Sequence, residues 1–127
     1  MNKKGVALLL ALFTLLIIAL LVVAFLETTT IDLQIVNNQL SRNKALYIAD
    51  AGVECVVSCL KINKANVTYS AQLPSGSGDT YSVTYVSSSG IITSKGTLAS
   101  GESVTLKAKV SVTGSPFTVN ILYWSEL

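Results

Sequence analysis

The chain begins with a long apolar segment and continues with an amphipathic one, without a helix-breaking residue between them. Residues 6–26 are apolar at every position except Thr14. A helix of these 21 residues would span roughly 31 Å, which matches the hydrocarbon core of a bilayer. No proline or glycine follows until Gly52. The pattern therefore predicts a transmembrane helix that continues beyond the membrane.

Residues 27–60 carry one apolar stripe, as expected for a helix with a single buried face. Apolar positions recur at spacings of three and four residues, and charged residues lie largely off the stripe. The spacing predicts one helix from about Val6 to about Leu60, with a transmembrane half and an amphipathic half. The stripe is formed by Leu46, Ala49, Val53, Val56 and Leu60, with Ile31, Ile35, Val36 and Leu40 upstream.

Residues 61–127 alternate apolar and polar positions in short runs separated by glycine, serine and proline. The alternating runs are 81–85, 90–95, 104–112 and 117–123. Period-two alternation is typical of antiparallel strands with one buried face. A sheet of this size is marginal alone and needs a cover, which residues 44–60 can supply. The sequence therefore predicts an α+β fold, in which the amphipathic half of the helix packs against a small antiparallel sheet.

The N-terminal charges predict the orientation of the membrane segment. Lys3 and Lys4 precede the apolar run, and positive flanks stay cytoplasmic, so the C-terminal part is expected outside the cytoplasm. A cleaved secretory signal peptide is the alternative. However, its apolar region would have about 7–15 residues and would end at a small-residue cleavage site, whereas residues 27–30 read Glu-Thr-Thr-Thr. A retained transmembrane helix is therefore favoured.

Composition excludes several kinds of chemistry. The chain has no histidine, which excludes a Ser-His-Asp triad and histidine metal sites. Two cysteines cannot by themselves hold a structural zinc, and a net charge of +2 is too small for a nucleic-acid-binding surface. We therefore expect a structural protein rather than an enzyme, with no cofactor, no metal site and no nucleic-acid partner.

Cys55 and Cys59 lie four residues apart on one side of the predicted helix. They could form a disulfide in an oxidising compartment. Helical neighbours at this spacing have Cβ atoms about 5–6 Å apart, whereas a disulfide requires about 3.5–4.5 Å. The helix would have to unwind locally, so two small buried residues packed under the sheet are the favoured alternative.

Two further groups of side chains are candidates for surface contacts. Asp50 and Glu54 are interpreted as a solvated helix face or as a contact between subunits, with Arg42 or Lys44 as partner, rather than as a catalytic pair. The aromatic residues are expected mostly in the core or on strands, and Trp124 is the best candidate for an exposed contact. These aromatic residues are Tyr47, Tyr81, Tyr85, Tyr123 and Trp124.

The N-terminal leader and the long helix together resemble those of type IV prepilins. The leader is Met1-Asn2-Lys3-Lys4-Gly5, and residues 42–54 resemble the small-residue block that ends the long helix in PilX-type minor pilins and pseudopilins. Residues 91–96 resemble the strand and turn that precede the last strands of such proteins, and residues 123–126 resemble their tail. The resemblance implies a pilin-like fold, cleavage by a prepilin peptidase between Gly5 and Val6, and methylation of the new N-terminus at Val6.

One residue departs from the pattern of the major pilins. In that family the fifth mature position is glutamate, which is thought to pair with the N-terminal amine of a neighbouring subunit. Here the position is Leu10. PilX-type minor pilins and the tip pseudopilin of type II secretion also lack this glutamate. The resemblance therefore implies a minor or tip-proximal subunit.

These observations predict a minor-pilin-like or pseudopilin subunit of a type IV pilus or a type II secretion filament. Residues 1–5 would be the leader, 6–26 the transmembrane half of the helix, 27–60 its amphipathic half and 61–127 the sheet. Its expected partners are other pilin or pseudopilin subunits, the prepilin peptidase and the bacterial inner membrane. After extraction it would belong to a periplasmic or extracellular filament. The alternative is a bitopic, signal-anchored membrane protein with a small extracytoplasmic β-rich binding domain.

Overall fold

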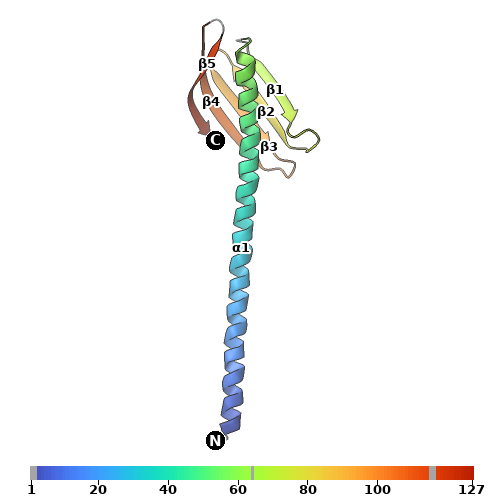
Figure 1. Cartoon of the computed structure of the whole chain (residues 1–127), viewed down its shortest axis with the longest axis vertical. Coiled ribbons are helices and arrows are strands. Elements are labelled where there is room, and N and C mark those ends of the chain that lie inside the picture. The colour runs from blue at the N-terminus through green and yellow to red at the C-terminus, as the bar shows by residue number, and fades with distance from the viewer. Residues whose placement is uncertain (1–2, 64, 115–116) are drawn as a thin grey trace. The chain divides into compact units, whose positions relative to one another are not determined.

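The computed structural model describes residues 3–63, 65–114 and 117–127. It confirms the expected α+β fold. The chain divides into two units, the first ending at Asn38 and the second comprising Gln39–Leu127, here called the head. In the described residues the elements are α1 (Lys3–Leu60), β1 (Val67–Gln72), β2 (Thr80–Val86), β3 (Ile91–Thr97), β4 (Ser103–Thr113) and β5 (Thr118–Glu126) (Figure 1).

The helix continues without a break through a run of β-branched residues that have low helix propensity. Thr28, Thr29 and Thr30 each donate a hydroxyl hydrogen bond to the backbone carbonyl four residues earlier, at 3.0, 2.9 and 2.8 Å. Thr14 donates likewise to the carbonyl of Ala11 at 2.9 Å. Each hydroxyl therefore has a partner on the helix itself, which lowers the cost of placing it among apolar surroundings.

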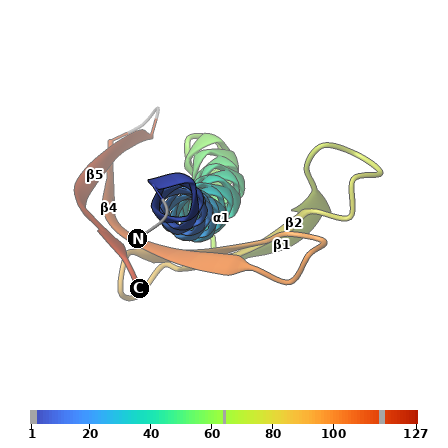
Figure 2. The same cartoon turned by 90° about the horizontal axis from the view of Figure 1, so that it is seen from below.

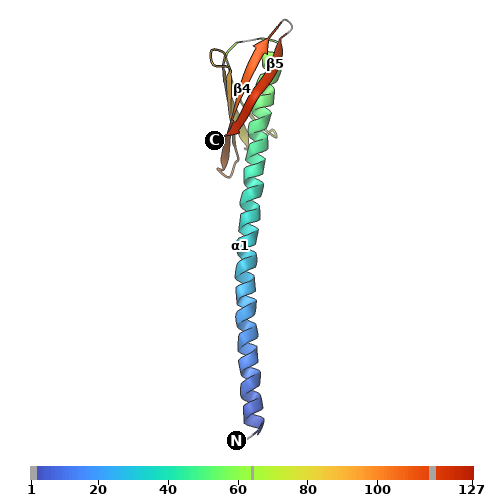
Figure 3. The same cartoon turned by 90° about the vertical axis from the view of Figure 1, so that its left-hand side faces the viewer.

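The five strands of the head form one antiparallel sheet in the order of the sequence, β1-β2-β3-β4-β5. Every neighbouring pair is antiparallel. The last turns of α1 run along one face of this sheet (Figures 1 and 3). Seen along the helix, the sheet curves around these turns, with β4 and β5 on one side and β1 and β2 on the other (Figure 2). The sheet therefore has an inner face against α1 and an outer face.

The core lies between the inner face and α1. On β2 and β4 every second residue is buried, as the alternation in the sequence predicts. The buried helical residues begin at Ala45 and end at Leu60. Burying one large apolar side chain stabilises the fold by about 1.5–3 kcal/mol. The largest fully buried apolar side chains are Tyr85, Leu60, Ile92, Leu106, Val53, Val56 and Val83.

α1 approaches β3 closely, because the residues at their contact are small. Gly96 faces the backbone of Ala45 and Ala49, and a Cβ atom there would lie only 2.6 Å from the amide nitrogen of Ala49. Ser94, which is fully buried, donates a hydrogen bond of 2.6 Å from its hydroxyl to the carbonyl oxygen of Ala49. Gly52 lies against the side chains of Ser94 and Tyr81. The small-residue block of the helix thus serves helix–sheet packing.

The sheet contains one strand, β1, that the sequence pattern does not predict. β1 pairs with β2 from Val67 opposite Tyr85 to Gln72 opposite Thr80. Its apolar positions include the weak strand former Ala71, and none of its residues is fully buried. The alternation of β1 is therefore too faint to distinguish it from a polar loop.

The final strand also differs from expectation. The register of β5 shifts between Lys109 and Val110, which pair with Tyr123 and Ile121, so Leu122 has no partner on β4. This bulge reverses the alternation beyond it. Residues 117–123 were expected to place Ile121 and Tyr123 on one buried face. Instead Ile121 shares the inner face with Val110, Tyr123 shares the outer face with Lys109, and both are exposed.

Candidate assembly surfaces

The first unit presents an uninterrupted apolar surface. Every large apolar side chain from Val6 to Leu26 is exposed, by between 39% at Val6 and 72% at Phe25. By length and composition, α1 is apolar enough to cross a membrane, and none of its most apolar window is covered by the rest of the described chain. A soluble protein rarely exposes so much apolar surface, which marks an interaction with lipid or with other protein surfaces.

The leader and cleavage residues predicted from the sequence lie at the start of this helix. Lys3, Lys4 and Gly5 form its first turn, Val6 and Leu10 follow, and all five are exposed. A Cβ atom at Gly5 would meet nothing within 4 Å. The backbone at the predicted cleavage position therefore carries no packing constraint. Met1 and Asn2 of the predicted leader lie outside the described residues.

Among the described residues, two ion pairs join α1 to the rest of the head. Arg42 donates from Nη2 to Oε1 of Glu126 on β5 at 2.6 Å. The Arg42 side chain is largely solvent-exposed and that of Glu126 is exposed by 36%, so this pair contributes at most about 1 kcal/mol. Nζ of Lys44 lies 2.7 Å from Oδ2 of Asp79, whose side chain is almost completely buried. Arg42 and Lys44 therefore have partners within the chain, and the expected contact of either with Asp50 or Glu54 of another subunit stays a prediction.

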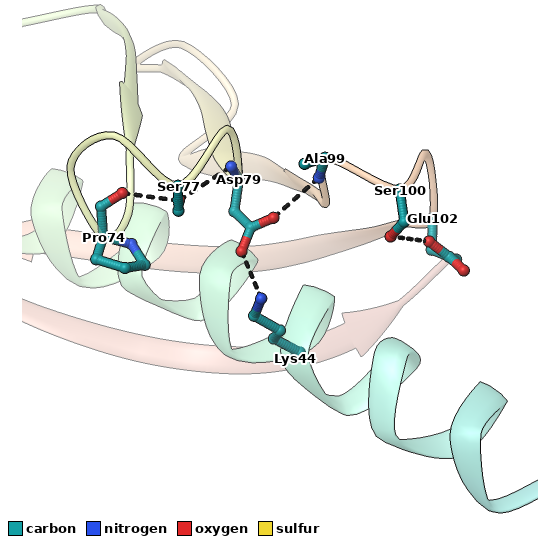
Figure 4. Close-up of polar contacts among 7 residues, drawn as sticks. All are labelled: Lys44, Pro74, Ser77, Asp79, Ala99, Ser100 and Glu102. Atoms are coloured by element: carbon teal, nitrogen blue, oxygen red, sulfur yellow. Dashed lines mark hydrogen bonds and ion pairs between the residues drawn. The ribbon is translucent and has the colours of Figure 1, made fainter.

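Asp79 is the centre of a polar network that joins three segments (Figure 4). Besides the Lys44 contact from α1, its Oδ1 accepts the backbone N–H of Ala99 at 2.9 Å. Its own N–H donates to the Ser77 hydroxyl at 3.1 Å, and its carbonyl accepts the N–H of Leu73. These contacts fix the β1–β2 loop and the β3–β4 turn against the helix. The hydrogen bond from Lys44, followed by that from Ala99, lowers the pKa of Asp79 below its ordinary value of 3.8.

We expect the stability of the head to fall in acid through Asp79. Its unfolded carboxylate takes up a proton near pH 3.8, whereas the folded one does so only at lower pH. The unfolded state therefore binds more protons in this range, and the stabilisation present above pH 3.8 is lost as the pH falls through the folded pKa. Asp79→Asn should lower the thermal midpoint at neutral pH and flatten its decline in acid.

The measurement is a series of thermal melts of the full chain in detergent micelles between neutral pH and pH 3. Glu54→Gln is the control, because it removes an exposed carboxylate from the same head. If Asp79→Asn declined in acid as steeply as the unchanged protein, Asp79 would not be the source of the dependence.

The two cysteines are free thiols with different surroundings. Cys59 is exposed and Cys55 is half-buried, so the expectation that both pack beneath the sheet is wrong for Cys59. Cys55 instead lies beside Tyr81 of β2. Burial raises the pKa of Tyr81 to about 12, and a hydrogen bond with Cys55 is the next largest cause.

The aromatic side chains divide between the core and the surface. Tyr81 and Tyr85 are buried, while Tyr47 on α1 is exposed. Tyr123 and Trp124 lie on β5, and Trp124 is exposed as expected. β5 is an edge strand, and the register places Trp124 on the inner face beside Ala108. The edge of the sheet therefore presents aromatic side chains on both faces.

Within residues 3–63, 65–114 and 117–127, no group of three or more His, Cys, Asp or Glu side chains is arranged to hold a metal ion. Comparisons of the chain with protein-family models, with curated proteins and with solved structures found no match. The function is therefore inferred from the residues and surfaces described above.

Proposed function

We propose that this protein is a minor-pilin-like or pseudopilin subunit of a type IV pilus or type II secretion filament. The observation that carries the proposal is the difference between the first and the last part of α1. Its first part, residues 6–26, exposes only apolar side chains apart from Thr14, whereas its last turns form the core of the head. An ordinary anchor needs only to span the membrane, and it does not require a helix that continues unbroken into the folded head.

The apolar surface suits a subunit that leaves the membrane for a helical bundle. Lipid tails and the apolar side chains of a helical bundle are similar surroundings for such a helix, so the free energy of transfer between them is close to zero. Packing between the helices then decides whether the helix stays in the membrane or joins the bundle. Leu10 adds no buried charge to this transfer, whereas an unpaired acidic group would be costly in lipid. The lack of an acidic residue at this position favours a minor or tip-proximal subunit over the bulk component.

The proposed life cycle follows from the leader. Lys3 and Lys4 hold the N-terminus on the cytoplasmic side of the bacterial inner membrane, with the head outside. Prepilin peptidase then cleaves between Gly5 and Val6, and Val6 is methylated. The α1 helices of neighbouring subunits pack together in a periplasmic or extracellular filament. The protein acts by assembly and not by catalysis.

The test is the N-terminus of the protein made in its native host. Intact-mass measurement should show loss of residues 1–5 and addition of a methyl group, and sheared filaments should contain the protein. Gly5→Val should keep the leader and be absent from filaments, although its side chain meets no neighbour in the fold. Ala7→Val, a similar change two residues later, should be processed normally.

A different result would identify the alternative function. If the unchanged protein keeps Met1 and sheared filaments lack it, the filament proposal is wrong. The chain would then be a bitopic membrane protein whose β-rich head binds a partner.

A further inference from the structure

The head carries positive charge on the outer face of its sheet and negative charge on α1. On the outer face of the sheet, Lys107 and Lys109 of β4 are exposed and alternate with the buried residues Leu106, Ala108 and Val110. Lys95 of the neighbouring strand β3 is exposed on the same face. The strands contain a single carboxylate, Glu126, which pairs with Arg42 of α1 on the inner side. The outer face is therefore basic, with no acidic side chain on the strands to balance it.

The part of α1 that the sheet does not fully cover carries two carboxylates. Glu54 is exposed and Asp50 is half-buried, and the two lie four residues apart on one side of the helix. The basic residues of the helix between Gln39 and Leu60 are Arg42 and Lys44. Both are held by other carboxylates. In the part of the chain that the structure describes, Asp50 and Glu54 form no ion pair, and neither do Lys107 and Lys109.

The two charged surfaces also match in spacing. Side chains four residues apart on a helix have Cβ atoms about 5–6 Å apart, and side chains two residues apart on a strand are separated by about 6.6 Å. Asp50 and Glu54 can therefore meet Lys107 and Lys109 as two simultaneous ion pairs. An exposed tyrosine adjoins each pair, Tyr47 one turn before Asp50 and Tyr123 opposite Lys109. Tyrosine is enriched in protein interfaces because it adds apolar area with a polar tip.

We propose that the head binds a second copy of this chain, with Asp50 and Glu54 of one copy against Lys107 and Lys109 of the next. One copy cannot join these surfaces itself, because they lie on opposite sides of the same head. An interface between two different surfaces of identical subunits propagates from copy to copy as a ring or a filament. The inference thus rests on the proposed filament function and deepens it by naming a contact between heads.

The experiment mixes isotopically light and heavy copies of the full chain in phosphatidylcholine vesicles, which carry no anionic lipid to occupy the lysines. A carbodiimide then joins carboxylates to amines that are in contact. Mass spectrometry should find hybrid peptides that link Asp50 or Glu54 of one copy to Lys107 or Lys109 of another. The yield should fall as salt is raised, because exposed charges are screened.

Charge reversal provides the decisive comparison. Lys107→Glu combined with Lys109→Glu should lower the yield of cross-linked heads to background, because the reactive amines are lost and like charges now face each other. Adding Asp50→Lys and Glu54→Lys to the same chain should restore it. Glu102→Lys, the same reversal on the β3–β4 turn, is the control and should leave the yield unchanged.

A separate measurement distinguishes this inference from the proposed function. Leu33 is exposed in the first unit, and Leu33→Cys in a chain lacking Cys55 and Cys59 reports packing between helices by disulfide formation. The contact between heads would be overturned if helix cross-links formed without hybrid head peptides. It would also be overturned if the charge reversals did not change the yield of cross-linked heads. Either result would leave the filament proposal standing. Loss of both kinds of cross-link, together with an unprocessed N-terminus, would overturn both.

Discussion

Gly96→Ala is expected to destabilise the head by about 3 kcal/mol, the upper end of the usual cost of overpacking. A Cβ atom at this position would lie 2.6 Å from the amide nitrogen and 3.2 Å from the Cα of Ala49, and it would overlap the carbonyl oxygen of Ala45. These are backbone atoms of α1, which cannot rotate aside as a side chain can. The helix would have to move away from β3, and the core contacts on both sides of it would weaken.

The measurement is the thermal unfolding of the full chain in detergent micelles, followed by circular dichroism of the sheet. A loss of about 3 kcal/mol corresponds to a fall of about 12–24 °C in the midpoint for a domain of this size. Lys95→Ala is the matched control, because it shortens an exposed side chain on the neighbouring residue of β3. It should change stability by less than about 0.5 kcal/mol. Equal midpoints for the two variants would show that α1 does not pack this closely.

The elements that could be predicted from the sequence are those with a strong local pattern. The apolar run 6–26 and the stripe ending at Leu60 describe a helix before any tertiary contact is known. The alternation on β4 is equally clear, because Val104 to Val112 bury every second side chain against one cover. In each case a single periodicity persists over several turns or residues, so local sequence alone carries the information.

The contacts that could not be predicted depend on how distant segments align. Lys44 and Asp79 are separated by 35 positions, and no local pattern pairs them. From the sequence, Gly96 is expected in a turn after Lys95. In the structure it lies against the backbone of Ala45 and Ala49. The bulge opposite Lys109 shifts the side chains of β5, although the sequence there still alternates. Of the assembly surfaces, the apolar helix was predicted, whereas the partners of Arg42 and Lys44 were not.

These unpredicted contacts bear on function because they decide which charges remain available. Once Glu126 and Asp79 hold Arg42 and Lys44, the carboxylates Asp50 and Glu54 have no ion-pair partner among the residues that the structure describes. The lysines that could meet them lie on the outer face of the sheet, which only another molecule can bring into contact. The fold thereby leaves the carboxylates of α1 and the lysines of β4 available for the proposed contact between two copies.

The second large effect is expected from Gly52→Ala, and its cause can be separated by a double-mutant cycle. A Cβ atom at Gly52 would overlap the hydroxyl oxygen of Ser94 and lie 2.9 Å from Cδ2 of Tyr81. Alanine favours the helix by about 0.5–1 kcal/mol over glycine. The clash outweighs this gain, because Ser94 must rotate away and abandon its buried hydrogen bond to Ala49. We expect a net loss of about 1–2 kcal/mol.

Ser94→Ala removes the same hydroxyl and should cost about 1 kcal/mol, since the carbonyl of Ala49 keeps its place in the helix. The double variant loses the hydrogen bond only once and no longer contains the obstructing oxygen. Its loss should therefore be smaller than the sum of the two single losses by about 1 kcal/mol or more. Ser94→Ala with Lys95→Ala is the control pair, and its effects should add. Additive losses for Gly52 and Ser94 would mean that the two residues do not meet, and that α1 crosses β3 at another register.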